Sequence, residues 1–181
     1  MVKGFFIFEV MITDILSSKE YSPYYQGYIE KATDQDILKG LGQNLKGVMN
    51  FYRSIPRHKQ QYTYAKDKWT VKDILLHVID TERIFAYRAL RIGRNDMTEM
   101  AGFDQDDYVL SANALSRTME SLVLEYKAVR QSTISLYENF SSEDLTRIGQ
   151  ASGSSISVRA IGYILAGHEN HHIQIIKERY L

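Results

Sequence analysis

The sequence has 181 residues, enough for one domain with a sizeable core, and its 44% hydrophobic and 24% charged residues are typical of a globular protein. Lysine plus arginine and aspartate plus glutamate number 22 each, so no excess of positive charge favours nucleic acid as a partner, while near-zero net charge is compatible with a homodimer. The absence of cysteine excludes disulfides, thiolate metal ligands and a cysteine nucleophile, so a metal site would need histidine, carboxylate or water.

The N-terminus begins with an apolar run that resembles a signal sequence only in part. The run is short, Glu9 interrupts it, and no small-residue cleavage site follows. Met11 is an alternative start, so we expect residues 1–20 to be an extension that is poorly ordered or wrongly included, and residues 21–181 to form the domain. No other stretch is long enough to span a membrane, and we expect a cytoplasmic protein without a membrane partner.

Four long segments repeat apolar residues with helical spacing, and the runs between them do not alternate as strands do. The first begins at Thr33 and Asp36, which have the spacing of a capping box, and ends before Pro56. The second begins at Thr70, which has an aspartate three residues later, and ends at Gly93. Both segments are therefore predicted to be amphipathic helices with defined ends.

The second half of the chain contains the other two predicted helices. The third runs from about Asn113 to Phe140, after a longer polar loop that contains Gly102. The small residues from Gly149 to Ser155 form a flexible stretch, and Ser157 then caps the fourth helix. The pattern predicts an all-α four-helix bundle, with metal sites built from inward-facing side chains and with loops that shape a pocket over one end.

The strongest functional signal is a pair of histidines one turn apart in the fourth helix. His168 and His172 lie within about 20° of the centre of its apolar stripe, whereas Glu169 lies about 80° from the centre. Neutral imidazoles in a dry core need partners, and one metal ion satisfies both. Catalytic sites usually take a third protein ligand. We expect His77, beside the stripe of the second helix, to supply it, and His58 in a polar loop is the other choice.

Two known helical metal sites fit the sequence less well. The string from His168 to His172 matches the His-Glu-x-x-His pattern of zinc peptidases, but only nine residues follow it, too few for a downstream third ligand. A di-iron carboxylate bundle needs a second Glu-x-x-His, and the residue three before His77 is Ile74. Both classes are disfavoured, whereas spacing does not exclude a haem or electron-transfer role.

Three separated motifs resemble the DinB-like, or YfiT-like, family of metal-dependent enzymes. They are residues 68–88 around Trp69 and His77, Gly-Phe-Asp-Gln at 102–105, and residues 157–173 around the histidine pair. The resemblance covers roughly residues 20–181. It implies an up-down-down-up four-helix bundle, often dimeric, whose divalent zinc, nickel or iron ion is bound by His77, His168 and His172.

The resemblance also limits the reaction. The family includes metal-dependent hydrolases, isomerases and S-transferases that use low-molecular-weight thiols, so we expect a hydrolase or a thiol transferase with a small-molecule substrate. An ion with open positions lowers the pKa of a bound water or thiol. Asp80, Glu82 and Glu169 are candidates to orient an imidazole or accept a proton, or else they lie on a solvated face or at the rim. The alternative is a non-enzymatic, stress-linked metal-binding or dimerisation protein with a structural ion.

Several other side chains near the predicted loops are each compatible with two roles. Tyr64, Trp69, Phe103 and Tyr108 are candidates to line an apolar mouth over the metal, although core packing is the simpler assignment. Arg83 and Arg88, on the second helix, would either bind a substrate carboxylate or pair with glutamates across the bundle.

Overall fold

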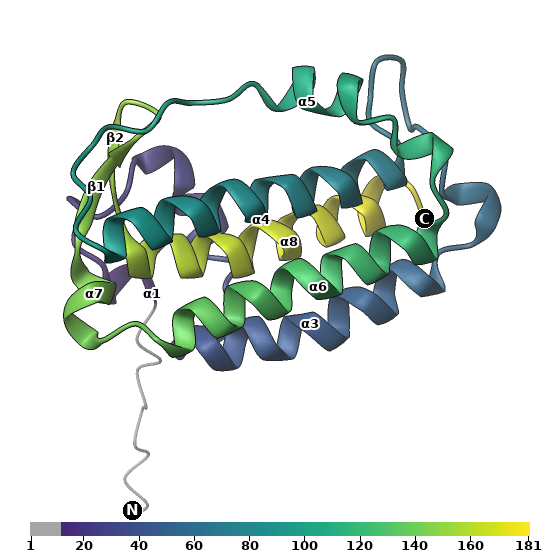
Figure 1. Cartoon of the computed structure of the whole chain (residues 1–181). Coiled ribbons are helices and arrows are strands. Elements are labelled where there is room, and N and C mark those ends of the chain that lie inside the picture. The colour runs from purple at the N-terminus through teal and green to yellow at the C-terminus, as the bar shows by residue number, and fades with distance from the viewer. Residues whose placement is uncertain (1–11) are drawn as a thin grey trace, which may run out of the picture.

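Four long helices form the body of the protein in a computed structural model that describes residues 12–181 (Figure 1). They are α3 (Ile37–Ser54), α4 (Val71–Gly93), α6 (Met119–Glu138) and α8 (Val158–Arg179). Helices α3 and α8 run in one direction and α4 and α6 in the other (Figure 1). The predicted all-α, up-down-down-up bundle is confirmed.

Each long helix packs against two neighbours. Helix α4 contacts α6 and α8, and α3 contacts the same two helices, so the consecutive helices α3 and α4 lie diagonally across the bundle. The connections from α3 to α4 and from α6 to α8 therefore cross the ends of the bundle, whereas the connection between the parallel helices α4 and α6 runs back along its length (Figure 1). No helix in residues 12–181 combines the length and the apolar character needed to cross a membrane.

Polar side chains determine where the long helices begin. The Asp36 carboxylate accepts a hydrogen bond from the backbone of α3, and Thr70 and Asp73 form the predicted capping box of α4. Thr118 and Ser157 cap α6 and α8 in the same manner. Each cap satisfies a backbone N–H that has no partner within its own helix.

The third long helix begins later than the sequence indicates. The predicted start near Asn113 is wrong, because Asn113 has a φ of 50° and adopts the left-handed conformation. It ends α5 (Gln105–Ala112), which occupies part of the expected polar loop and is capped by Asp104, and a short 3-10 helix, η3 (Ala114–Ser116), follows. The regular helix resumes only at Met119.

A β-hairpin replaces the flexible stretch expected before the fourth helix. Strands β1 (Ile148–Ala151) and β2 (Ser154–Ser157) pair antiparallel, so the prediction of no strand is wrong here. Ser152 and Gly153 have φ values of 53° and 71°, as a tight hairpin turn with two left-handed residues requires. Four-residue strands are too short to show clear alternation in a sequence.

Other short helices lie in the N-terminal segment and in the connections between the long helices. They are α1 (Ile12–Ile15), η1 (Pro23–Tyr25), α2 (Gln26–Ile29), η2 (Arg57–Lys59) and α7 (Ser142–Thr146). Helix α2 packs on α8, and α7 contacts both α4 and α8.

The segment before residue 20 packs against the bundle from residue 12 onward. Ile12 and Leu16 are buried, and the buried Glu20 accepts hydrogen bonds from Arg159 at 2.6 Å and from Ser157 at 2.9 Å. The sequence-based boundary at residue 20 therefore falls inside a segment that contacts the core. Residues 1–11, the rest of the expected extension, lie outside the described residues.

The core consists of two apolar clusters with a polar layer between them. The cluster toward the hairpin includes Phe85, Ile92, Tyr137 and Ile161, and the opposite one includes Val48, Ile74, Leu122 and Ile176. At mid-length the four long helices instead contribute the buried polar residues Asn44, Glu82, Arg130 and Glu169. This polar layer stands at the same height along the helices as the histidines.

Candidate metal centre

The three histidines predicted from the sequence converge at one point between α4 and α8. The Nε2 atom of His168 lies 3.1 Å from Nε2 of His77 and 3.0 Å from Nε2 of His172. One nitrogen from each ring lies within 4.8 Å of the others. The helix periodicity explains the pair on α8, and the antiparallel packing of α4 on α8 supplies the third ring.

Hydrogen bonds alone satisfy this cluster poorly. A neutral imidazole nitrogen carries either one proton or one lone pair, so Nε2 of His168 forms a full hydrogen bond with only one of its two neighbours. Two nitrogens that each lie about 2.0–2.1 Å from one metal ion are roughly 3.0–3.4 Å apart at bond angles of about 95–110°. The spacing and the donor type therefore both fit a divalent ion that prefers imidazole ligands.

Burial keeps the imidazoles neutral. Burial lowers the pKa of His77 to about 4, and burial together with the neighbouring imidazoles lowers the pKa of His172 to about 3. The same causes hold the pKa of His168 well below its ordinary value. At neutral pH all three rings thus have a lone pair free for a metal ion.

Three further side chains hold the rings in place. Thr81 lies one turn after His77, and its Oγ1 is 3.4 Å from Nδ1 of that ring. The hydroxyl can accept a hydrogen bond from a protonated Nδ1, which leaves Nε2 free for a metal ion. The Trp69 ring packs on His77 with centroids 4.8 Å apart, and the edge of Tyr28 meets His168 at 5.2 Å. The role of Thr81 is not predicted from the sequence.

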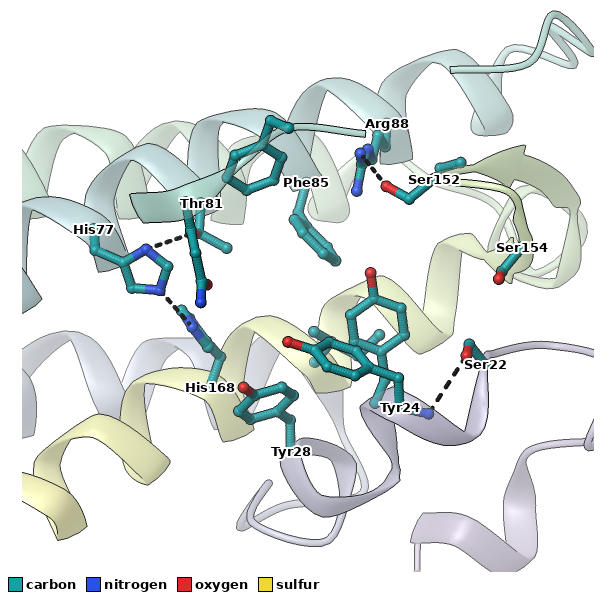
Figure 2. Close-up of a pocket in the computed structure, with 15 residues that line it drawn as sticks. Ser22, Tyr24, Tyr28, His77, Thr81, Phe85, Arg88, Ser152, Ser154 and His168 are labelled. Carbon is teal, nitrogen blue, oxygen red and sulfur yellow. Dashed lines mark hydrogen bonds between the residues drawn. The ribbon is translucent and has the colours of Figure 1, made fainter. Parts of the chain in front are cut away.

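A cavity of about 320 Å³ opens beside the histidines (Figure 2). His77 and His168 line one end of it, and Arg88, Ser152 and Ser154 line the other. Aromatic rings from α2, α4 and the loop before α5 form the walls between the two ends. The arrangement is that of a small-molecule site, with apolar walls and a few polar groups at defined places.

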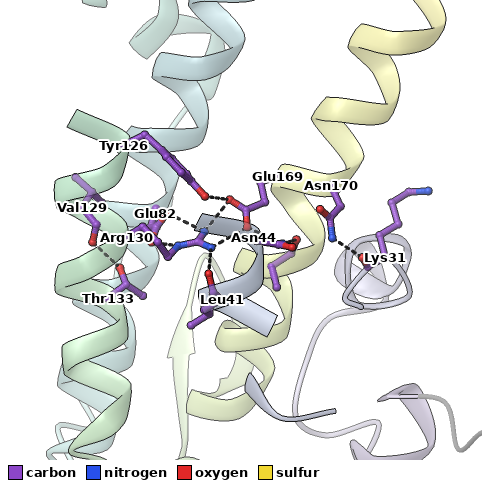
Figure 3. Close-up of polar contacts among 11 residues, drawn as sticks. Lys31, Leu41, Asn44, Glu82, Tyr126, Val129, Arg130, Thr133, Glu169 and Asn170 are labelled. Carbon is purple, nitrogen blue, oxygen red and sulfur yellow. Dashed lines mark hydrogen bonds and ion pairs between the residues drawn. The ribbon is translucent and has the colours of Figure 1, made fainter. Parts of the chain in front are cut away.

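The carboxylates expected near the imidazoles make other contacts. Glu82 and Glu169 both bind the guanidinium of Arg130, each at 2.7 Å (Figure 3). Tyr126 donates a 2.6 Å hydrogen bond to Glu169, and Asn44 donates one of 2.7 Å. The expectation that these glutamates orient an imidazole is therefore wrong, because both side chains point into the polar layer of the core.

Asp80 and Glu169 do not match the alternative predictions for them, a fully solvated face and a position at the rim. Asp80 is half-buried rather than fully solvated and lies 3.5 Å from Arg83. Glu169 is only 1% exposed, so it is not a rim residue. Helical-wheel geometry misplaces it because α8 is buried on two sides. His168 faces the cavity, whereas Glu169 faces α3 and α6.

Glu169 does not line the cavity, although a zinc peptidase requires the glutamate of this motif to face the metal-bound water. His58 lies exposed in η2, away from the three-histidine cluster. His171 is half-buried and contacts Tyr28, with ring centroids 5.2 Å apart. The histidine-rich string thus contributes two of its three rings to the cluster.

The four aromatic residues considered for the mouth are divided between two roles. Phe103 lines the cavity, and Trp69 packs on the histidines. Tyr64 packs against Tyr180 instead, and Tyr108 is an exposed residue that contacts Phe103.

Comparison with known families agrees with this geometry. The model of the DinB superfamily matches residues 47–176, which include all three clustered histidines. The chain belongs to the DinB superfamily. This DinB protein is 24% identical over 154 residues to a candidate metal-dependent hydrolase of Oceanobacillus iheyensis, a match that covers 82% of this chain and 87% of the relative.

The fold of this DinB protein also has a solved counterpart. It superimposes on YfiT from Bacillus subtilis, which is described as a probable metal-dependent hydrolase with an unusual four-helix bundle topology. The TM-score is 0.68 at 14% sequence identity, and the match covers 88% of this chain and 91% of YfiT. At that identity the likeness establishes the fold alone.

Proposed function

We propose that this DinB protein is a metal-dependent enzyme, a hydrolase or a thiol S-transferase, that acts on a small molecule in the cavity beside His77, His168 and His172. The observation that carries the proposal is the convergence of three neutral imidazoles, two of which, His77 and His168, line one end of a cavity. The descriptions of the Oceanobacillus relative and of YfiT support metal-dependent hydrolysis. Zinc, nickel and iron are among the ions that imidazole donors bind well.

A divalent ion held there supplies a Lewis acid and lowers the pKa of a bound water or thiol. The residues of the chain do the remaining work. His77, His168 and His172 would hold the ion, and Thr81 and Trp69 restrict the rotation of the His77 ring. Phe85 and Phe103 give the cavity apolar walls, which exclude water from a bound substrate.

A purely structural ion is the competing role. An ion that only joins α4 to α8 needs no cavity beside it, whereas this cluster borders one. The spectrum of the cobalt-substituted protein distinguishes the two roles. A catalytic site responds to added azide or thiol because it has open positions, and a closed structural site does not.

The ligand set is tested by metal analysis. Wild-type protein reconstituted with zinc is expected to hold about one ion per chain, and His77→Ala is expected to lose it on dialysis. His58→Ala is the matched control, because that histidine is exposed and outside the cluster. Full occupancy in His77→Ala would overturn the assignment.

The reaction class is tested on the loaded protein. Ester and amide hydrolysis and the transfer of a small thiol to an electrophile are measured side by side, with metal-stripped protein as the reference. Turnover that needs the metal and is lost in His168→Ala supports an enzyme. If His168→Ala and His172→Ala lower only stability and no substrate turns over, the structural role is correct.

A further inference from the structure

Arg88 is a buried cation at the end of the cavity away from the histidines. The residue is 2% exposed and lines the cavity together with Ser152 and Ser154 (Figure 2). It follows His77 by eleven residues on α4, which is about three turns, so both side chains lie on one face of the helix. Their Cα atoms are roughly 16 Å apart along the axis.

Among the side chains that the structure describes, no carboxylate forms an ion pair with Arg88. Its Nη2 donates hydrogen bonds to the Ala101 carbonyl at 3.0 Å and to the Ser152 hydroxyl at 2.8 Å. The Tyr25 hydroxyl is a further hydrogen-bonding partner of the guanidinium, and all three groups are uncharged. The other fully buried arginine, Arg130, binds two glutamates. On the same helix as Arg88, Arg83 pairs with Glu125 at 2.7 Å.

A buried guanidinium without an anion is costly, because it loses its hydration and gains no opposite charge. Hydrogen bonds to neutral oxygens do not by themselves require a positive charge. If Arg88 only linked α4 to the hairpin, its positive charge would therefore have no role. The guanidinium lies over the rings of Phe85 and Phe103, 5.0 Å and 5.9 Å from their centroids, which fixes its plane at the cavity wall.

We propose that Arg88 binds a carboxylate of the substrate. The inference rests on the proposed function, since it places the reacting bond at the opposite end of the cavity, beside His77 and His168. The substrate class is an elongated molecule with a carboxylate at one end, an apolar middle against Phe85 and Phe103, and the reacting group at the other end. Arg83, which the sequence places in the same role, is occupied at the surface.

Binding of a matched pair of probes tests this inference without the metal. Titration calorimetry on metal-stripped protein compares 4-phenylbutyrate with its uncharged amide, 4-phenylbutyramide. A charge-assisted hydrogen bond makes the acid bind about 10–100-fold more tightly than the amide. Arg88→Gln is expected to reduce this preference to within about threefold, and Arg83→Gln, the control on the same helix, is expected to leave it intact.

Equal affinity of the wild type for the acid and the amide would overturn the inference, as would an undiminished preference in a folded Arg88→Gln. If Arg88→Gln does not fold, the wild-type comparison decides together with NMR of the arginine Nε–H groups, where one resonance must move with the acid and not with the amide. The result is separable from that of the metal centre, because the metal is absent from the titration and zinc occupancy of Arg88→Gln is measured independently.

Discussion

Thr81 contacts Nδ1 of His77, on the side of the ring away from the other two histidines, and its hydroxyl can accept a hydrogen bond from a protonated Nδ1, which leaves Nε2 unprotonated. Replacing it with valine keeps the shape and removes the acceptor. We expect Thr81→Val to weaken zinc binding about tenfold, the lower end of the usual range for a residue behind a metal ligand, because the contact is long at 3.4 Å. Competition with a chromophoric chelator measures the affinity.

The control for this substitution is Thr133→Val. Thr133 is equally buried, but its hydroxyl bonds to the Val129 carbonyl within α6. Zinc affinity should be unchanged in this variant. Equal losses in both variants would mean that Thr81 acts through general stability and not through the tautomer of His77.

The metal-free protein should lose stability in weak acid. Histidines in the unfolded chain take up protons below about pH 6.5, whereas the folded pKa of His77 is about 4 and that of His172 about 3. The unfolded state therefore binds more protons, and the free energy of unfolding decreases as the pH falls from about 6.5 to about 4. Chemical denaturation at several pH values in the presence of a chelator measures the decrease.

Replacing one buried histidine measures how much that histidine contributes to the decrease in the free energy of unfolding. In His77→Leu the decrease should be smaller by on the order of 3 kcal/mol, the equivalent of a pKa lowered from 6.5 to about 4. His58→Leu, in which an exposed ring is removed, should follow the wild type. A His77→Leu curve parallel to that of the wild type would contradict the assigned burial.

The site residues that could be predicted from the sequence are those that helical spacing alone identifies. His168 and His172 follow from the helical repeat, and His77 from its place beside a stripe. The partners of Glu82 and Glu169 could not be inferred, because Arg130 lies on α6, at least 39 residues away in sequence. Such a network depends on which helices are neighbours, and local periodicity carries no information about that.

Among the elements, α2 and α8 approach so closely that only glycine fits between them. A Cβ on Gly167 would lie 1.7 Å from the carbonyl oxygen of Tyr28. Gly167→Ala should therefore push α2 away, destabilise the fold by about 1–3 kcal/mol and displace the Tyr28 ring from His168. Denaturant unfolding and zinc affinity of the same samples measure both effects.

Gly47, in α3, has room for an added side chain, unlike Gly167. It is exposed in a helix interior, and an added Cβ meets nothing within 4 Å. Gly47→Ala should stabilise the protein by about 0.5–1 kcal/mol, because alanine restricts the unfolded chain and favours the helix. A similar gain in Gly167→Ala would show that α2 is not tightly packed on α8.

The long elements were predictable more accurately than the short ones. The caps of α4 and α8 are residues whose side chains act within three positions of themselves, so their sequence signals are local. The start of α6 and the hairpin depend on left-handed residues at Asn113 and Ser152. Neither residue is glycine, so the usual sequence signal for a left-handed conformation is missing at both positions.

Across the whole molecule, the polar layer joins the four long helices through Arg130. Its guanidinium bonds to the Leu41 carbonyl on α3, to Glu82 on α4 and to Glu169 on α8 (Figure 3). Arg130→Met would leave two carboxylates buried without a cation, which should cost about 3–5 kcal/mol of the free energy of unfolding. Guanidinium denaturation measures the loss.

Two further variants test whether unpaired buried charge causes this loss of stability. Adding Glu82→Gln and Glu169→Gln to Arg130→Met removes the buried charges and should recover most of the loss. Arg53→Met breaks only an exposed ion pair with Glu120 and should cost less than about 1 kcal/mol. If the triple variant were no more stable than Arg130→Met, lost packing and not unpaired charge would explain the effect.

The diagonal arrangement of α3 and α4 could be predicted only through the family resemblance. Amphipathic periodicity identifies four helices, but it is equally compatible with every order in which they can be arranged. The buried ion network on α3, α4, α6 and α8 is compatible with only a few of these orders.

The cavity is assembled from two kinds of segment, which has a consequence for divergence among related chains. The histidines stand on the two long helices α4 and α8, where a shift would also disturb the polar layer behind them. Much of the opposite wall comes from α2, the loop before α5 and the hairpin turn. Mutations in these shorter segments can reshape the space for a substrate and leave the imidazoles in place, so new specificities are expected to arise there first.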